Sequence, residues 1–385
     1  MTPRTVFGMT LYNNARHLPE ALDSLLAQTD PDFGLVMLDD GSSDGTEQIA
    51  RAYLQRDTRL RYVRHVSRQG MVAGWRAAFE HARREFGAAP YFAWASDHDV
   101  WRPEWLARAK AELDGHPEAV LAYPRSLRID AAGGILGKEP KTFETVGLAT
   151  ARERWLRFSG DAAGAGDLVY GLMRVDAMER AGVFRPVLLP DRLLMLEMTL
   201  QGEFRQVPEV LWLRRQSESS VQRQRSSLFI ETNRPAGLWM PWWAQHAAVM
   251  NREYARPGTV DGITGLIVRY VVMSWLRRHS KSQGVGHRLD NAAERIAWRA
   301  KTLRRSVWTL WYEGGQSLTA WQGRLRRRLR LWVYSVLVLR RRVRAAMYEA
   351  GVQSGKSFAR LRRAARRGLH HTLVLTHRLG LRGRS

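Results

Sequence analysis

The sequence predicts an α/β fold through about residue 225, followed by an α-helical, basic C-terminal region. Short apolar runs alternate with segments of helical periodicity through the first 125 residues, and acidic turns directly follow two of the apolar runs. This alternation is typical of right-handed βαβ units around a parallel sheet. A third observation, a concentration of arginine after residue 320, separates the C-terminal region from the rest.

Each expected strand is a short apolar run, and each expected helix repeats apolar side chains every three or four residues. The expected elements are, in order, a strand over residues 5–10, a helix over 18–26, a strand over 34–38, a helix over 47–55, a strand over 60–65, a helix over 72–86, a strand over 91–95, helices over 176–181 and 191–201, and a strand over 209–214. From about residue 226 the pattern becomes helical, aromatic and basic. We therefore expect a first domain over residues 1–225, a helical, Trp-rich region over 226–317 and a basic amphipathic tail over 318–385.

Charge and composition restrict the possible functions. The 385 residues include 61 Lys and Arg against 37 Asp and Glu, a formal net charge of +24. Residues 320–385 hold 18 of the basic residues and one acid, Glu349. Because arginine pairs well with phosphates, a polyanionic partner is possible. The absence of cysteine excludes a disulfide scaffold, a Cys-ligated metal site and a thiol nucleophile.

The first acidic turn follows the strand expected over residues 34–38. Helix capping alone explains why Ser43, Asp44 and Thr46 precede a helix. It does not explain the adjacent Asp39 and Asp40 at the end of the strand, because two neighbouring carboxylates repel each other unless a ligand or cation is bound. The pair therefore indicates a binding site.

The second acidic turn is Asp97-His98-Asp99, directly after the strand expected over residues 91–95. Two carboxylates two residues apart can share one divalent cation and its bound phosphates, and Mg²⁺ and Mn²⁺ favour oxygen ligands. Ligands of parallel sheets bind at the carboxyl ends of the strands, where both acidic turns are expected. Alone the second turn is a weak signal, but the two turns together are specific.

These turns, together with Thr10-Leu11-Tyr12-Asn13-Asn14, resemble family 2 glycosyltransferases. Later segments are similar to that family in the same order. They are Gly171-Leu172-Met173-Arg174, Gly182-Val183-Phe184, Asp191 and Val207-Pro208-Glu209-Val210-Leu211. The resemblance covers about residues 5–225. It implies the GT-A nucleotide-sugar-binding fold, with a Rossmann-like mixed sheet, and the inverting transfer of a sugar from a nucleotide-sugar donor to an acceptor hydroxyl.

The resemblance also implies roles for individual residues. Tyr12 and Asp39 would hold the nucleobase, Asp97 would contact the ribose or the sugar, and Asp99 would ligate a Mn²⁺ or Mg²⁺ ion that bridges the diphosphate. The nucleotide-sugar-binding residues are then Thr10, Tyr12, Asp39, Asp40, Arg76 and Asp97. Arg76, or alternatively Arg68, is the candidate to reach the diphosphate.

Asp191 falls where the family places the carboxylate that deprotonates the acceptor hydroxyl, and an inverting transfer needs a single such base. Two departures from the family pattern stand near these residues. Pro190 precedes Asp191 where many members have Glu, and Gly74-Trp75-Arg76 stands where many have Ala-Arg-Asn. The Gln-x-x-Arg-Trp motif of processive synthases is absent, which favours transfer of one sugar at a time.

Two further motifs are ambiguous or weak. Residues 160–166 contain Gly-x-Gly but lack the strand-to-helix context and the downstream acid of a dinucleotide site. Trp239, Trp242 and Trp243 flank Pro241 and are compatible with stacking on a sugar, with a lipid interface or with core packing. The longest apolar stretches, residues 263–276 and 331–339, are shorter than the roughly 20 residues of a spanning helix, so we expect none.

The tail combines an apolar helical stripe with a basic surface. The stripe consists of Leu325, Leu329, Trp332, Val333, Val336, Val343 and Met347. The favoured interpretation is a peripheral helix on an anionic membrane, ahead of packing on a partner and of nucleic-acid binding. With the resemblance, this implies a cytoplasmic protein on the inner membrane that acts on a glycan or lipid-linked acceptor in bacterial surface polysaccharide or glycolipid assembly. The alternatives are a non-catalytic nucleotide-sugar-binding or scaffold protein and a nucleic-acid binder.

Overall fold

The computed structural model describes residues 2–137, 142–160, 165–216, 228–229, 242–254 and 263–279. The chain divides into two compact units, residues 1–266 and 267–385. The first unit contains the sheet and nearly all of the described helices. The tail expected over residues 318–385, and most of the helical region expected over 226–317, lie outside the described residues, so the boundaries between the three expected regions stay predictions.

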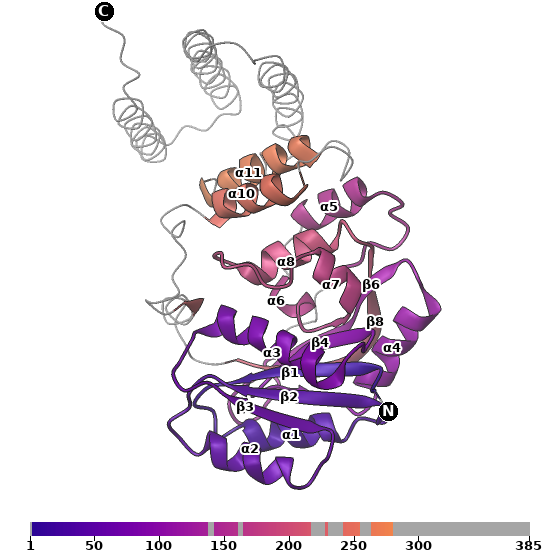
Figure 1. Ribbon diagram of the computed structural model, residues 1–385. Coiled ribbons are helices and arrows are strands. Elements are labelled where there is room, and N and C mark those ends of the chain that lie inside the picture. Colours follow the sequence, from indigo (N-terminus) through magenta and orange to yellow (C-terminus); the bar gives the residue numbers. More distant parts are fainter. Residues whose placement is uncertain are drawn as a thin grey trace, which may run out of the picture. The chain divides into compact units, whose positions relative to one another are not determined.

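One mixed sheet forms the centre of the first unit (Figure 1). Its strands are β1 (Thr5–Leu11), β2 (Phe33–Asp39), β3 (Leu60–Arg64), β4 (Tyr91–Ser96), β5 (Val100–Trp101), β6 (Ala119–Ile129), β7 (Leu172–Arg174) and β8 (Glu203–Arg215). They lie side by side in the order β3-β2-β1-β4-β7-β6-β8-β5. β3, β2, β1 and β4 are parallel, β7 is antiparallel to both of its neighbours, and β6 is parallel to β8. The predicted Rossmann-like mixed sheet is confirmed.

The helices connect and cover these strands. They are α1 (Leu18–Leu26), α2 (Thr46–Leu54), α3 (Met71–Phe86), α4 (Trp105–Gly115), α5 (Ala151–Gly160), α6 (Ala165–Leu168), α7 (Val175–Arg180), α8 (Pro190–Met198), α10 (Trp242–Tyr254) and α11 (Ile263–His279). None of the described helices is both long enough and apolar enough to cross a membrane.

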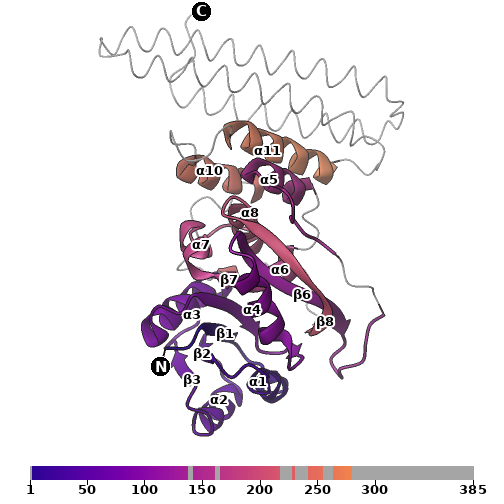
Figure 2. The same cartoon turned by 90° about the vertical axis from the view of Figure 1, so that its right-hand side faces the viewer.

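The two faces of the sheet bury different helices (Figures 1 and 2). Side chains on alternate residues of β1, such as Phe7, point to the side of α1, α2 and α4, where the Phe7 ring lies 5.6 Å from that of Trp105. α3 covers the other face, and it approaches closely because Gly8 and Gly34 have no side chain there. A Cβ on Gly34 would lie 2.5 Å from the ring of Phe86. Close packing of α3 therefore fixes the turn that precedes it.

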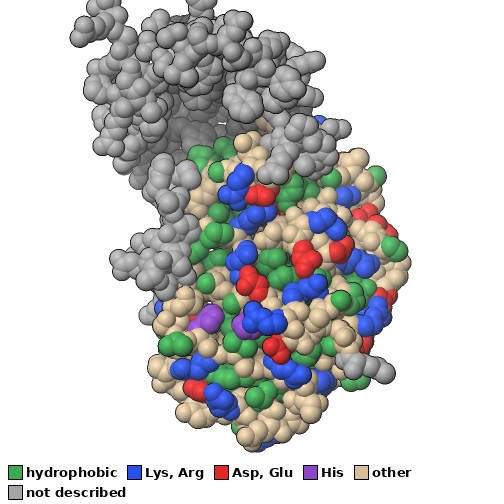
Figure 3. Space-filling model, viewed as in Figure 1, with side chains coloured by type: hydrophobic (Ala, Val, Ile, Leu, Met, Phe, Trp, Pro, Cys, Tyr) green, Lys and Arg blue, Asp and Glu red, His purple; other side chains and the backbone are tan. Residues whose placement is uncertain are grey.

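On the face shown in Figure 3, basic and acidic side chains are interspersed, and neither kind gathers in one patch. This agrees with the sequence, in which most of the basic excess follows residue 320. On this side the surface of the first unit therefore carries both charges, and a polyanionic partner is predicted from the charge of the tail alone.

The predicted elements of the first 100 residues match the structure closely, and α1 has the predicted bounds. Farther along, the sequence did not predict β5, β6, β7, α4, α5 or α6. It predicted β8 only over residues 209–214, whereas the strand begins at Glu203. β7 has three residues, and the pairing of β6 with β8 shifts register on both sides of Arg125. Short or irregular strands give no sustained period-two pattern in the sequence, so whether they form depends on the strands with which they pair.

Candidate functional site

The carboxyl ends of β1, β2 and β4 meet at one edge of the sheet. β1 lies between the other two strands, with Leu11 opposite Asp39 and Thr10 opposite Ser96. The residues that follow these strands therefore converge, as predicted. Thr10 itself is half-buried within β1, one residue before the strand ends.

Asp39 is fully buried at the end of β2, with none of its surface exposed. Its carboxylate accepts hydrogen bonds from the N–H of Ser42 at 2.7 Å and from the hydroxyl of Tyr62 at 2.7 Å, and the Arg64 guanidinium lies 3.6 Å away. Burial, followed by the hydrogen bond to Asp39, raises the pKa of the Tyr62 hydroxyl. Asp39 therefore ties the turn after β2 to β3.

Asp40 is held from the other side. One carboxylate oxygen accepts the N–H of Gln69 at 2.7 Å and lies 2.9 Å from Nδ1 of His65, and the other accepts the N–H of Gly70 at 2.8 Å. Gly70 has a φ of 89° and directly precedes α3, a conformation that glycine adopts without strain. The two neighbouring carboxylates are thus kept apart by separate sets of donors.

Asn13 and Asn14 join the two acidic turns. The Asn13 side chain accepts the N–H of Ser43 at 2.7 Å, and the Asn14 amide donates to Oδ1 of Asp97 at 2.9 Å. Asn13 has a φ of 50°, in the left-handed region that Asn tolerates better than most residues. The N-cap residue of α2 is Gly45, which has no side chain, and Asp44 before it accepts the N–H of Thr46 at 2.9 Å. The polar side chains of the turn also bind the 13–15 segment.

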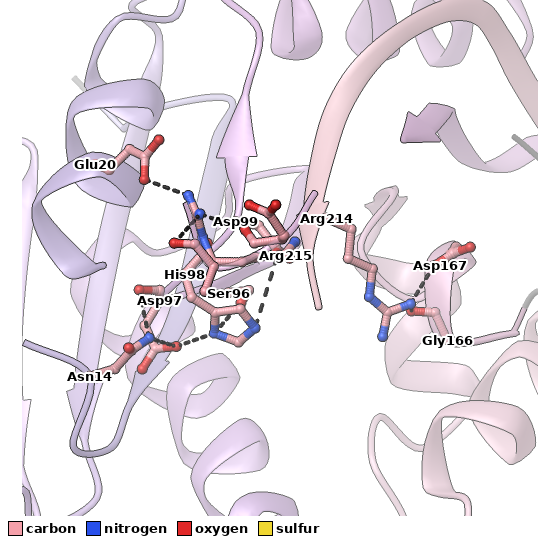
Figure 4. A network of polar contacts seen from close by, with 12 residues as sticks. Asn14, Glu20, Ser96, Asp97, His98, Asp99, Gly166, Asp167, Arg214 and Arg215 are labelled. Atoms are coloured by element: carbon pink, nitrogen blue, oxygen red, sulfur yellow. Dashed lines mark hydrogen bonds and ion pairs between the residues drawn. The ribbon is translucent and has the colours of Figure 1, made fainter. Parts of the chain in front are cut away.

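Asp97, His98 and Asp99 form the second acidic turn (Figure 4). The Asp97 carboxylate accepts the N–H of Tyr12 at 3.3 Å and lies 2.7 Å from Nδ1 of His98. Asp99 is 1% exposed, and its Oδ1 accepts the N–H of Arg215 at 2.8 Å. Burial raises the pKa of the Asp99 carboxyl, and the nearby positive charges lower it less. For His98, burial lowers the pKa, but the hydrogen bond to Asp97 and the charges of Asp97 and Asp99 together outweigh burial, and the pKa is raised.

Two further predicted residues flank this edge differently. Tyr12 is 40% exposed, and the guanidinium of Arg68 lies 4.2 Å from the centre of its ring. Arg76, on α3, donates to the carbonyl oxygen of Phe184 at 2.7 Å. Arg68 is therefore the one of the two arginines that lies beside a predicted nucleobase contact, and the role of Arg76 at the diphosphate stays a prediction.

The departure at residues 74–76 has a structural reason. The Trp75 ring is buried against Trp94, with centroids 5.6 Å apart, and against Phe184, at 4.6 Å. Together with the Arg76 hydrogen bond, this fastens α3 to the segment around Phe184.

Asp191 lies in the first turn of α8, directly after Pro190, which suits the first position of a helix. Burial raises the pKa of the Asp191 carboxyl, and it is opposed by the backbone N–H of Arg192 and by the charge of Arg214. A Cβ placed on Gly166 would lie 3.6 Å from both Oδ2 of Asp191 and Nη1 of Arg214, so the carboxylate and the guanidinium face the same small space.

Arg214 and Arg215 end β8, and their side chains point in opposite directions (Figure 4). Arg215 donates to the carbonyl oxygen of His98 at 2.8 Å and forms an ion pair with Glu20. Arg214 forms an ion pair with Asp167. The sequence reading assigned no role to either arginine, although a pair of arginines at the end of an apolar strand is a visible signal.

One tyrosine shows that the two sides of the site share a single electrostatic environment. Burial raises the pKa of Tyr170, Arg214 opposes the rise, and three carboxylates add to it. These carboxylates are Asp97, Asp99 and Asp191. Arg214 in turn has a raised pKa, because its acidic neighbours outweigh the effect of burial. Asp99, the predicted metal ligand, and Asp191, the predicted base, therefore both interact electrostatically with Tyr170 and Arg214.

The donor set around Asp99 fits a divalent cation that also binds the substrate. Among the described residues, no group of three His, Asp or Glu side chains could hold a metal ion by itself. Mg²⁺ is commonly bound through one or two carboxylates plus substrate phosphates. A buried carboxylate with a raised pKa, such as Asp99, is stabilised when such a cation neutralises it.

Comparison with known proteins shows similarity to glycosyltransferases in the N-terminal part of the chain. Residues 7–156 match the model of Glycosyl transferase family 2. The chain is 28% identical over 115 residues to the putative glycosyltransferase EpsE of Bacillus subtilis and 34% identical over 98 residues to an uncharacterized glycosyltransferase of Nostoc. These alignments cover 30% and 25% of this chain, and 40% and 29% of the two relatives.

A crystal structure of S. aureus TarS 1-349 in complex with UDP-GlcNAc is similar over 76% of this chain and 78% of that chain, with a TM-score of 0.51 and 16% identity. Residues 7–156 are therefore similar to family 2 of the glycosyltransferases, and the chain has the GT-A fold. Asp191, Arg214 and Arg215 lie beyond the segment that matches the family model.

Proposed function

We propose that the chain transfers one sugar from a nucleotide-sugar donor to an acceptor hydroxyl, with inversion at the anomeric carbon. The observation that carries this proposal is the shared environment of buried Asp99 and half-buried Asp191, two carboxylates with raised pKa values that both act on Tyr170. A donor-binding side and a proton-accepting side within reach of each other are what a direct displacement requires.

On the donor side, the nucleotide would lie along the carboxyl ends of β1, β2 and β4. Tyr12 offers an exposed aromatic face, and the Asp97 carboxylate accepts the N–H of Tyr12 at 3.3 Å. Asp39 is fully buried, so it would act on the nucleobase through the turn that it holds. Asp99 would hold Mn²⁺ or Mg²⁺ together with the donor diphosphate. When bound, the cation supplies positive charge to the diphosphate.

On the acceptor side, Asp191 would accept the proton of the acceptor hydroxyl. The acceptor oxygen then forms a bond to the anomeric carbon while the bond from that carbon to the diphosphate oxygen breaks, and the electron pair leaves with the nucleoside diphosphate. Burial favours this role, because a carboxylate with a raised pKa is a stronger base. The charge of Arg214 lies near the negative charges on both sides and offsets part of their repulsion.

Nucleoside diphosphate release from a panel of UDP-, GDP- and dTDP-sugars, with Mn²⁺, with Mg²⁺ and with EDTA, tests the proposal. UDP-GlcNAc is the first donor to try, since the structurally similar TarS fragment was crystallised with it. We expect metal-stimulated release from at least one donor. Nucleotide-sugar binding without release, with every donor and metal, would favour the non-catalytic alternative instead.

For the acceptor, we propose a glycan or lipid-linked hydroxyl in bacterial surface polysaccharide or glycolipid assembly, reached from the cytoplasmic face of the inner membrane. This rests on the sequence of the tail, where 18 Lys and Arg stand against one acid. Near an anionic bilayer, each basic residue contributes on the order of 1 kcal/mol before screening.

Co-sedimentation of the full chain with anionic and neutral vesicles tests the membrane contact. We expect binding to anionic vesicles that weakens as salt is added. A variant with Arg326–Arg328 and Arg340–Arg342 replaced by Gln should bind them less. Binding to RNA in place of vesicles would instead support the nucleic-acid interpretation.

A further inference from the structure

Helix α10 lies outside the segment that matches the family model, and the proposed chemistry gives it no role. Two adjacent side chains of α10 nevertheless hold both backbone groups of one residue, Leu188. Oε1 of Gln245 accepts the Leu188 N–H at 2.9 Å, and Nε2 of His246 lies 2.8 Å from the Leu188 carbonyl oxygen. Leu188 stands three residues before Asp191.

Both side chains are deeply buried, with Gln245 5% and His246 0% exposed. Burial lowers the pKa of His246 to about 3, so its ring is neutral at physiological pH. A neutral imidazole beside a carbonyl oxygen must carry its proton on the nitrogen that faces that oxygen. His246 is therefore fixed as a donor and Gln245 as an acceptor, and neither can exchange roles without losing a bond.

The turn that these bonds hold is strained. Leu189 has a φ of 53°, a left-handed conformation that a non-glycine residue keeps only where the surrounding structure enforces it. Pro190 follows and begins α8. Since Asp191 is the next residue, the position of its carboxylate depends on how firmly this turn is held.

Other contacts extend along α10 in both directions. The Arg192 guanidinium lies 5.0 Å from the ring centre of Trp242, at the start of the helix. Near its end, Glu253 lies 3.5 Å from Arg185. α10 therefore contacts the chain on both sides of the strained turn. The Trp242 contact also favours core packing over lipid or sugar stacking for this residue.

We propose that Gln245 and His246 are positioning residues for Asp191, and that α10 contributes to catalysis by holding the turn that precedes α8. Their bonds to Leu188 fix the left-handed turn, and the turn fixes the first residues of α8. This inference rests on the proposed role of Asp191 as the base. It assigns a function to a helix that the first 225 residues, and the sequence resemblance, do not include.

Paired substitutions test the proposal in the full chain. Gln245→Met removes the acceptor and His246→Leu removes the donor at similar volume, whereas Gln245→Glu and His246→Gln keep an acceptor and a donor. We expect the first pair to lower kcat by about 10- to 100-fold, the scale of a small misplacement of a reacting group. Donor KM should stay within about twofold, because the nucleotide side is untouched, and the second pair should recover most of kcat.

Val249→Ala is the matched control, because Val249 is a buried residue of α10 that makes no polar contact with the turn. It should lower the melting temperature without lowering kcat. Amide hydrogen exchange gives a readout that does not depend on turnover, and exchange at residues 188–192 should accelerate in Gln245→Met and His246→Leu but not in Val249→Ala.

The outcomes separate two possible errors. Wild-type kcat in Gln245→Met and His246→Leu, while Asp191→Asn is inactive, would overturn the positioning role alone. An equal loss of kcat in Val249→Ala would reduce the effect to general stability and overturn it as well. If Asp191→Asn retains wild-type kcat, the proposed base is wrong and the inference that rests on it is wrong too.

Discussion

The two carboxylates at the end of β2 are buried and the carboxylate at the start of α8 is half-buried, and their surroundings differ. Asp39 and Asp40 each accept at least two hydrogen bonds from nearby turns. The Asp191 carboxylate accepts backbone hydrogen bonds at Asp191 and Arg192 and lies near the charge of Arg214, but burial outweighs them and raises its pKa. Buried carboxylates that are bonded to turns on both oxygens suit a structural or ligand-orienting role, whereas a half-buried carboxylate with a raised pKa suits the acceptance of a proton.

The strongest test of this contrast is Asp191→Asn, which keeps the shape of the side chain but cannot accept a proton at neutral pH. We expect kcat to fall by roughly 10²–10⁴, the usual scale for loss of a general base. Nucleotide affinity, measured by calorimetry, should stay unchanged. A kcat close to that of the wild type would assign the base to another residue.

In the wild type, kcat should fall on acidification with a pKa above the ordinary aspartate value of about 3.9, because burial raises the pKa of Asp191. The acidic limb of the pH profile reports this value.

Asp99→Ala should have the next largest effect. Removal of the carboxylate would weaken binding of the cation, which provides several kcal/mol of charge stabilisation. We therefore expect metal-stimulated turnover to fall by a factor of about 10²–10³. Affinity for the nucleoside diphosphate should fall as well, unlike in Asp191→Asn. Asp176→Ala, on an exposed side chain of α7, is the control. Full activity of Asp99→Ala, or wild-type activity in EDTA, would contradict the metal assignment.

Asp40→Asn tests the fully bonded side of the contrast. The amide group would turn a donor toward the N–H of either Gly70 or Gln69, which leaves a buried donor without an acceptor. We expect the free energy of unfolding to fall by about 1–3 kcal/mol and donor KM to rise, with little change in kcat at saturation. Urea unfolding and steady-state kinetics measure both. A large fall in kcat with an unchanged donor KM would contradict the distinction between Asp40, which we expect to affect donor binding, and Asp191, which we expect to affect the chemical step.

The smallest expected effect concerns Glu197, a buried residue of α8 whose pKa is raised by burial to about 7 from 4.5, against the opposing charge of Arg185. The folded protein then holds a proton that the unfolded chain loses, so stability is complete below pH 4.5 and falls as pH rises toward 7. Glu253 and Tyr254 also face this group.

Glu197→Gln should remove that pH dependence, on the order of 3 kcal/mol at most, when unfolding is measured between pH 4.5 and 8. An unchanged slope in the variant would show that the Arg185 ion pair keeps Glu197 ionised throughout this range.

The donor side could be predicted from the sequence because its parts are local. Asp39, Asp40, Asp97 and Asp99 follow apolar strands directly, and parallel strands bring their carboxyl ends together without further information. The first four strands and the first three helices were predicted for the same reason.

The acceptor side depends on contacts between distant segments. Arg215 is bonded to Glu20, which is 195 residues away, and Arg214 pairs with Asp167, 47 residues away. No local sequence pattern predicts such contacts between distant residues. The hydrogen bonds from α10 to Leu188 cross 57 and 58 residues, and the helix that makes them carries no motif.

The bonds of Arg215 also set an order of events during synthesis. The segment from β1 to β4 can pair as soon as it leaves the ribosome, but the only backbone hydrogen bond described for the Asp99 carboxylate comes from residue 215. A nascent chain that stops short of this residue holds the strands of the proposed nucleotide site but lacks this bond to Asp99, the proposed cation ligand. The proposed cation ligand therefore gains this bond only after the last strand of the sheet along the chain, β8, has been made.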